Sequence, residues 1–329
     1  MDRRTWIGAT AGGLLAMPRF ACAQSAQRIY RVGILRPAAR PLSPDDPQLA
    51  GIPNGLRELG YVQGRNLVIE QRFANGEADR LPALARELVR AKVDVIVAVA
   101  AAAVLAAKEA TATIPIVMYG NFEPVALGFA ASLARPGGNI TGVLIAPDGT
   151  LAAKRLELLK AVAPQARRIA HLTASGDPAM PMQLLEADKA AAALGIELIV
   201  VEVRGGDYAR GFAIAEAKRA GALLVGSSSI FLRDRKEIIA LAATHRLPAM
   251  YEWREQVVDG GLMAYGTSLQ GVFRRVATYV DRILKGAVAG DMPIERPTTF
   301  ELVLNKSTAR ALGLTIAQPL LLRVDELIE

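Results

Sequence analysis

Short apolar runs alternate with longer amphipathic stretches along the first half of the chain. Strands that are covered on both faces produce runs of this kind, which are almost continuously apolar and rich in β-branched residues. The runs that predict strands span residues 31–35, 67–73, 93–99, 115–119 and 140–144. Helices are predicted over residues 48–60, 80–91 and 125–134, and in the alanine-rich stretch after residue 99. This order indicates a parallel sheet with helices on both faces.

The same alternation is repeated in the second half. Its apolar runs predict strands over residues 168–173, 196–203, 222–226, 248–253, 261–266 and 300–305. Its amphipathic stretches predict helices over residues 151–162, 182–194, 208–220, 233–245 and 269–286, followed by a last helix capped by Ser307. The repetition is one of architecture, because no stretch of residues is itself repeated.

Together the two halves predict an α/β fold of two doubly wound parallel-sheet lobes, joined by a hinge with crossing segments. A chain of 329 residues is too long for one small core and suits two domains of ordinary size. We expect residues 28–145 with about 268–290 to form the first lobe. Residues 146–267 with about 291–329 are expected to form the second.

Residues 1–23 differ in character from the rest and predict an export signal. A charged start precedes a weakly apolar stretch, and Ala21-Cys22-Ala23 supplies the small residues that a signal peptidase recognises. The pair Arg3-Arg4 resembles a twin-arginine signal, and an ordinary secretory signal with two chance arginines fits equally well. We therefore expect a periplasmic protein, cleaved near Ala23. Cys22 is the only cysteine, so the cleaved chain would have no thiol for a disulfide or a metal.

Composition narrows the classes of partner. The chain is 52% hydrophobic, but its longest apolar run after the leader contains Asp94 and ends at Lys108 and Glu109, unlike a spanning helix. We expect a soluble protein. Its formal charge is +7, but the basic residues are scattered among carboxylates, whereas a nucleic-acid binder concentrates them on one face. Nucleic acid is not an expected partner, and a monomer is expected.

In open parallel sheets, ligands bind beyond the carboxyl ends of the strands. The loops at those ends predict a ligand site between the two lobes. The residues we select are Arg36, Ala101, Ala102, Tyr119, Asn121, Glu123, Ser175, Ser227, Ser228, Tyr251, Glu252 and Tyr265.

Each kind of residue has both a ligand-binding and a structural interpretation. The alanines open a helix whose free N–H groups favour an anion, or they only build that helix. The serines either contact the ligand or cap a helix. The tyrosines suit an aromatic or apolar ligand, or fill the core. Glu123 and Glu252 can hold an ammonium group, or can be solvated.

The sequence offers no arrangement for catalysis. His171 lies inside a predicted strand and His245 at a helix end, and neither stands near a carboxylate and a hydroxyl in the sequence. No histidine pair has metal-ligand spacing. We therefore expect no enzyme activity, no cofactor and no metal.

Several stretches carry a resemblance to a known family. They include GLRELGYVQGRNLVIE, ASLARPGGNITGV, GGLMAYGTSL and PTTFELVLNKSTARALGL. From about Tyr30 onward the chain resembles the ABC-transporter substrate-binding proteins related to the tryptophan-binding protein TrpX. The resemblance implies a type I periplasmic-binding-protein fold, with a ligand held between hinged lobes. It also implies a permease and an ATPase as partners, and in characterised relatives an aromatic amino acid as ligand.

The chain departs from the family in the loops expected to contact ligand. Members often carry Thr or Ser where this chain has Ala100 to Ala103, Asp-Pro where it has Glu123-Pro124, and Ser at Ala264. These changes make the first-lobe wall more apolar. We expect a receptor that captures an aromatic or apolar amino acid or related carboxylate for an importer. The alternative is a sensory binding protein that presents its ligand to a membrane receptor without transport.

Overall fold

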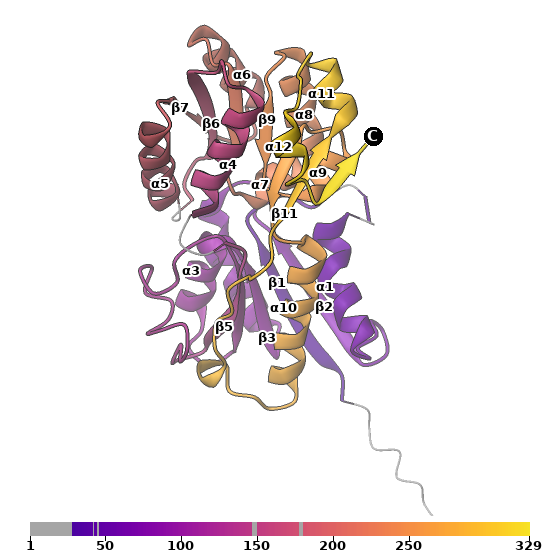
Figure 1. Cartoon of the computed structure of the whole chain (residues 1–329). Coiled ribbons are helices and arrows are strands. Elements are labelled where there is room, and N and C mark those ends of the chain that lie inside the picture. Colours follow the sequence, from indigo (N-terminus) through magenta and orange to yellow (C-terminus); the bar gives the residue numbers. More distant parts are fainter. Residues whose placement is uncertain (1–27, 42, 45, 147–149, 178–179) are drawn as a thin grey trace, which may run out of the picture.

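The computed structural model describes residues 28–41, 43–44, 46–146, 150–177 and 180–329. The predicted export signal lies outside these residues. Figure 1 shows two lobes stacked on each other, with strands in the middle of each and helices on the outside. None of the helices in the described part of the chain combines the length and the apolar character that a membrane crossing requires.

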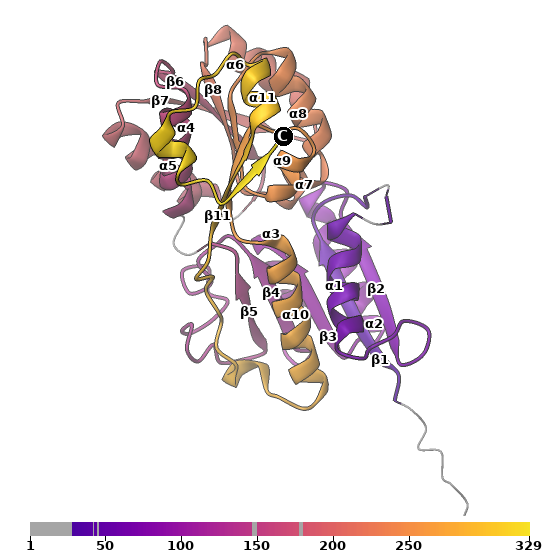
Figure 2. The same ribbon diagram turned by 45° about the vertical axis from the view of Figure 1, so that its right-hand side comes forward.

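Lobe 1 contains a five-stranded parallel sheet in the order β2-β1-β3-β4-β5. Its strands are β1 (Tyr30–Arg36), β2 (Leu67–Phe73), β3 (Val95–Val99), β4 (Ile116–Gly120) and β5 (Ile140–Leu144). One face packs on α1 (Pro47–Glu58) and α10 (Leu269–Leu284), which lie side by side in Figure 2. The other face packs on α2 (Leu81–Arg90) and α3 (Ala100–Ala110). The predicted parallel sheet covered on both faces is confirmed.

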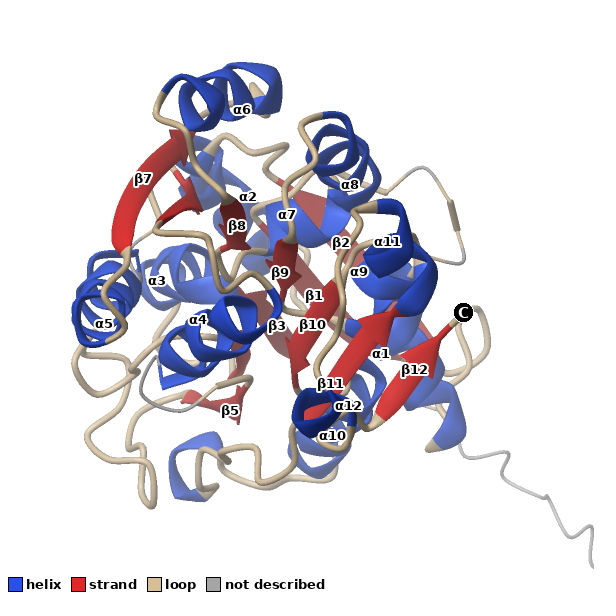
Figure 3. Cartoon of the chain, turned by 45° about the horizontal axis from the view of Figure 1, so that its top comes forward, coloured by secondary structure: helices blue, strands red, loops and turns tan. Residues whose placement is uncertain are grey.

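Lobe 2 contains a seven-stranded sheet in the order β12-β11-β10-β9-β8-β6-β7, drawn in red in Figure 3. The strands are β6 (Arg168–Ala174), β7 (Glu197–Val203), β8 (Ala222–Val225), β9 (Ala249–Tyr251), β10 (Met263–Gly266), β11 (Glu301–Asn305) and β12 (Glu326–Ile328). Only the pairing of β10 with β11 is antiparallel among these described strands.

The helices of lobe 2 cover both faces of its sheet. One face packs on α4 (Thr150–Val162), α5 (Met180–Ala193), α11 (Lys306–Ala311) and α12 (Gln318–Leu321). The other packs on α6 (Tyr208–Ala217), α7 (Ser229–Arg233), α8 (Arg235–Thr244) and α9 (Arg254–Val258).

The chain passes between the lobes after β5, after β10 and before β11. The second passage returns α10 to lobe 1, and the short 3-10 turn at Ala289–Asp291 follows it there. Residue 295 still lies along β5, because the Leu144 N–H donates to the Glu295 carbonyl at 2.8 Å and the Glu295 N–H donates to the Gly142 carbonyl at 3.0 Å. The crossing segment that leads to β11 is therefore hydrogen-bonded to lobe 1 before it leaves that lobe.

The helix predicted over residues 125–134 is wrong. This segment forms turns, with Gly128 at φ +69°, in the left-handed region that an α-helix cannot contain. Phe122 and Phe129 pack edge to face at 5.7 Å in the buried core. The apolar side chains that suggested a helix thus fill the core from a folded loop.

The last predicted helix also begins differently from the prediction. The Asn305 side chain, not Ser307, caps α11 by accepting a hydrogen bond from the Thr308 N–H at 2.9 Å. The elements α7, α9, α12 and β12 were not predicted as separate elements. Each is three to five residues long, which is too short for a hydrophobic period to show.

Candidate ligand-binding cavity

A cavity lies between the lobes, where the carboxyl ends of both sets of strands face each other. Its apolar wall is formed by Val99, Ile145, Leu232, Trp253, Leu269 and Phe273. These side chains come from both lobes, and those of Leu232 and Trp253 in lobe 2 belong to the same buried cluster as the α1–α10 face of lobe 1. A wall of this kind suits a ligand with an aromatic or apolar body.

The start of α3 forms part of the lobe 1 wall. Ala100 lies in the left-handed region at φ +64°, which costs an alanine about 1–2 kcal/mol. Gly120 on β4 packs against it, since a Cβ at Gly120 would meet the Ala100 Cα at 3.1 Å. The strained residue turns the chain from β3 directly into α3, so that Ala100 and Ala101 line the cavity.

Lobe 1 also contributes a buried cation behind this wall. Arg36 ends β1 with 1% of its surface exposed, and its Nη1 donates to the Tyr119 hydroxyl at 3.0 Å. Tyr119 lines the cavity, and its ring meets that of Phe273 edge to face at 5.8 Å. The Nε and Nη2 atoms of Arg36 have no hydrogen-bond partner among the described residues, and the same holds for Gln48 Nε2 at the cavity wall.

The polar wall of lobe 2 is organised by Arg155, which sequence analysis did not select. Its guanidinium donates to Ser227 Oγ at 2.9 Å and to the Tyr265 carbonyl at 2.8 Å, and lies 3.4 Å from Glu252 Oε1. Arg155 and Glu252 are both buried. Burial lowers the pKa of Arg155, and the neighbouring carboxylate of Glu252 partly offsets that effect. The arrangement is a closed ion-pair network that holds Ser227 and Glu252 at the cavity wall.

His171 lies behind this network, in the interior of β6. Burial, with a smaller effect of the Arg155 charge, lowers its pKa to about 4. The imidazole is therefore neutral at neutral pH and has no place as a cation in the site. Within the described residues, no three His, Cys, Asp or Glu side chains are grouped so that they could hold a metal ion.

Polar contacts join the lobes beside the cavity, among them the hydrogen bond that Gln183 Nε2 on α5 donates to the Asn121 carbonyl at 3.4 Å. Asn121 Nδ2 of lobe 1 donates to Ser227 Oγ of lobe 2 at 2.9 Å. Arg235 on α8 pairs with Asp46, the N-cap of α1, at 3.0 Å and with Asp259 at 2.7 Å. The two sheets thus meet as one closed arrangement around the cavity.

Comparison with known proteins identifies the family. Residues 43–328 match the family model described as ABC transporter substrate binding protein. The chain belongs to this family. Within the family's description, a substrate-binding protein holds a ligand for a transporter, which agrees with a cavity formed by two lobes.

The relatives of this substrate-binding protein are distant in sequence and close in fold. It is 23% identical over 269 residues to a tyrosine-binding protein of Clostridioides difficile, covering 82% of this chain and 77% of the relative. It is 24% identical to a conserved domain protein of Vibrio cholerae, with a TM-score of 0.81. An ABC domain of Streptococcus pneumoniae in complex with L-Trp is also 24% identical, with a TM-score of 0.80. The match to each of these two structures covers 91% of this chain and 100% of the chain in that structure. The fold is that of the type I periplasmic binding proteins.

Six of the residues selected from the sequence line the cavity of this substrate-binding protein. They are Ala101, Tyr119, Asn121, Ser227, Ser228 and Glu252. The residues of the lining that the selection omitted are mainly apolar, together with Gln48, Asp177 and Ser229. Arg155 has a signal in the sequence: it stands four residues from both Leu151 and Leu159, on the buried face of α4. An arginine on the buried face of a helix requires a buried partner for its charge.

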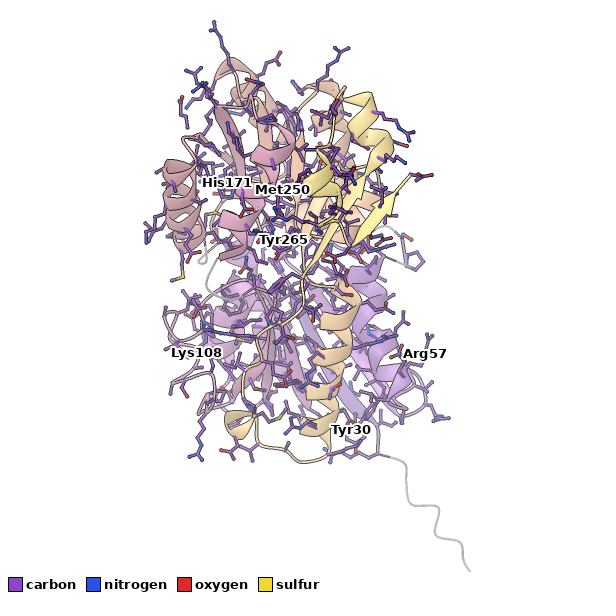
Figure 4. All side chains as sticks on the ribbon, in the orientation of Figure 1. Tyr30, Arg57, Lys108, His171, Met250 and Tyr265 are labelled. Atoms are coloured by element: carbon purple, nitrogen blue, oxygen red, sulfur yellow. The ribbon has the colours of Figure 1, made fainter. Side chains whose placement is uncertain are left out.

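The other selected residues lie outside the cavity lining. Ala102 follows Ala101 on α3, and Ser175 follows β6. Glu123 lies 3.8 Å from Arg296. Tyr265, labelled in Figure 4 near the junction of the lobes, stacks on Phe300 at 5.9 Å. Tyr251 is buried in the lobe 2 core and borders a separate cavity next to Leu247 and Leu312. Tyr251 is the last residue of β9, whereas Glu252 lies in the bend that follows, 3.4 Å from Arg155.

Proposed function

We propose that this protein is an exported receptor that captures an aromatic or apolar amino acid, or a related carboxylate, and delivers it to an ABC permease and its ATPase. The observation that carries the proposal is the inter-lobe cavity, which combines an aromatic and aliphatic wall with polar groups at the strand ends of both lobes. The relatives named for tyrosine and for bound L-Trp support the same class of ligand.

The ligand contacts that we propose come from both walls. Tyr119, Asn121 and Ala101 act from lobe 1, with Arg36 behind Tyr119. Ser227, Ser228 and Glu252 act from lobe 2, where Arg155 holds Ser227 and Glu252 in place. The remaining selected residues, Ala102, Glu123, Ser175, Tyr251 and Tyr265, support the loops that carry these contacts.

The proposed mechanism is closure around the ligand. A ligand that touches both lobes binds the closed form more tightly than the open one, so it shifts the population toward closure. The closed surface is then what a permease recognises. Export with removal of residues 1–23 would place the receptor in the periplasm, where the ligand arrives.

A thermal-shift screen tests the proposal directly. The purified protein is heated with aromatic amino acids, aromatic acids, branched-chain amino acids and small amides. A ligand that binds only the folded state stabilises it by about 2.7 kcal/mol at a hundredfold excess over its Kd, which raises the melting temperature. We expect a shift with at least one aromatic or apolar compound and none with sugars. If sugars alone shift the transition, the proposed ligand class is wrong.

A further inference from the structure

The carboxyl edge of the lobe 1 sheet places a cation directly behind the cavity wall. Leu35 of β1 pairs with Ala98 of β3, and Val99 pairs with Tyr119 of β4. Arg36, Val99 and Tyr119 therefore follow one another across three neighbouring strands, on the face that packs against α1 and α10. Two of the three line the cavity, and the third is hydrogen-bonded to one of them.

This cation has no anionic partner in the part of the chain that the structure describes. No carboxylate of the described residues lies within ion-pair distance of Arg36, and two of its three nitrogens have no hydrogen bond. A buried charge without a counter-charge is costly to the folded state. Gln48 Nε2 adds a second unpaired donor at the same wall, although only 3% of the residue is exposed. The wall thus contains positive charge and unused donors.

Tyr119 connects Arg36 to the cavity. Its hydroxyl accepts the hydrogen bond from Arg36 Nη1, so its own hydrogen is left to donate elsewhere. A hydroxyl that accepts from a cation is a stronger donor to the next group, because hydrogen bonds in a chain polarise one another. The group that fits in front of Tyr119 is therefore an anionic acceptor.

The opposite wall offers nothing comparable to a cationic group. Among the described residues, the acidic side chains that line the cavity are Glu252 and Asp177. Glu252 is already paired with Arg155, and Asp177 also has a partner within the protein. An ammonium group in the cavity would lose its hydration without gaining an uncommitted carboxylate.

From these contacts we infer that the ligand is a net anion: a carboxylate with an aromatic or apolar body and no ammonium group. Its carboxylate accepts from Tyr119 and Gln48, and Arg36 acts through Tyr119 as a positioning residue that supplies the counter-charge. The inference rests on the proposed function and narrows its ligand class from amino acids and carboxylates to the carboxylates alone.

Matched ligands test this on the unaltered protein. Calorimetry compares 3-phenylpropanoate with L-phenylalanine, indole-3-propanoate with L-tryptophan, and each acid with its neutral amide. A hydrogen bond to a charged group contributes enough to change affinity by about tenfold to a hundredfold. We expect each acid to bind at least about tenfold more tightly than its amino acid or its amide. Tighter binding of the amino acids would overturn the inference and leave the proposed receptor function standing. Binding of none of these compounds would instead contradict the proposed function itself.

Variants of Arg36 and Tyr119 identify which side chains produce the preference for acids. In Arg36→Met and Tyr119→Phe, the preference for acid over amide should fall to within about threefold, since the charge-assisted hydrogen bond is gone. Arg36→Lys should recover part of the preference. Without ligand, Arg36→Met should melt no lower than the unaltered protein, because it removes a buried charge that has no partner. A folded Arg36→Met protein that keeps the full preference, or one that melts well below the parent, would show that Arg36 has a structural role only.

Discussion

The two walls of the cavity differ in how their buried arginines are paired. On lobe 2, Arg155 is surrounded by Glu252, Ser227 and the Tyr265 carbonyl, so its charge and donors are satisfied within the protein. On lobe 1, Arg36 donates to the Tyr119 hydroxyl, and its other two nitrogens have no hydrogen-bond partner among the described residues. The guanidinium of lobe 2 is therefore satisfied before a ligand arrives, and that of lobe 1 is not. Selectivity for ligand charge should therefore be a property of lobe 1, while lobe 2 provides a fixed surface for closure.

The largest expected effect comes from breaking the lobe 2 network. Arg155→Met would leave Glu252 buried without its cation, which typically costs about 3–5 kcal/mol of folding free energy. We expect unfolding in urea at a clearly lower midpoint and loss of ligand binding by calorimetry. Lys154→Met is the matched control, because Lys154 pairs with Glu157 at the surface, and its effect should stay within about 0.5 kcal/mol. Equal midpoints for the two variants would show that the Arg155 network does not stabilise the lobe.

His171 makes the same wall sensitive to acid. Its folded pKa of about 4 lies below the ordinary 6.5, because burial disfavours the charged imidazole. Between pH 6.5 and pH 4 the unfolded chain therefore binds a proton at His171 that the folded chain does not bind. The free energy of unfolding consequently falls as the pH falls from 6.5 toward 4, by about 3 kcal/mol in total. His171→Gln should flatten the fall in melting temperature between pH 7.5 and 4.5. A parent-like slope in His171→Gln would contradict the assignment.

A smaller effect is expected where the two walls are joined. Arg235→Gln removes the ion pair between α8 and Asp46, so closure should be weaker and ligand affinity lower by about tenfold. X-ray scattering of the ligand-free variant should show a more open particle. Arg254→Gln removes an exposed pair with Glu326 inside lobe 2 and should change neither quantity. A scattering profile of Arg235→Gln that superimposes on the parent would rule out a role in closure.

The smallest effect concerns the strained start of α3 on lobe 1. Ala100→Gly relieves the left-handed strain but also frees the unfolded chain, so the two effects should leave it up to about 1 kcal/mol more stable. Ala102→Gly, within the helix, should instead lose about 1 kcal/mol. Chemical denaturation measures both. The same sign in both variants would mean that Ala100 carries no strain.

The hydrophobic pattern was sufficient to predict the architecture, because most strands longer than four residues contain a run of apolar residues. It failed at residues 125–134, where the apolar spacing of a helix coexists with Gly128 and a core-filling loop. The strand-end rule brought the selection to loops that line the cavity between the lobes. It did not separate Glu252, which lines that cavity, from Tyr251, which borders a different one. The point at which so short a strand ends is not readable from sequence. Arg155 was missed because its partners come from β10 and from the loops after β8 and β9. Only the folded chain brings these segments together.

The return of α10 to lobe 1 has a consequence for the order of synthesis. Val276 and Ala277 on α10 cover the same face of the sheet as Ile52 and Leu56 on α1, yet more than two hundred residues of chain separate the two helices. A ribosome that has released the five strands of lobe 1 has still to make most of lobe 2 before α10 emerges. Until then an apolar strip of the first sheet is exposed to water and to other chains. The nascent protein should accordingly bind holdase chaperones through this strip and release them only when residue 284 has left the exit tunnel.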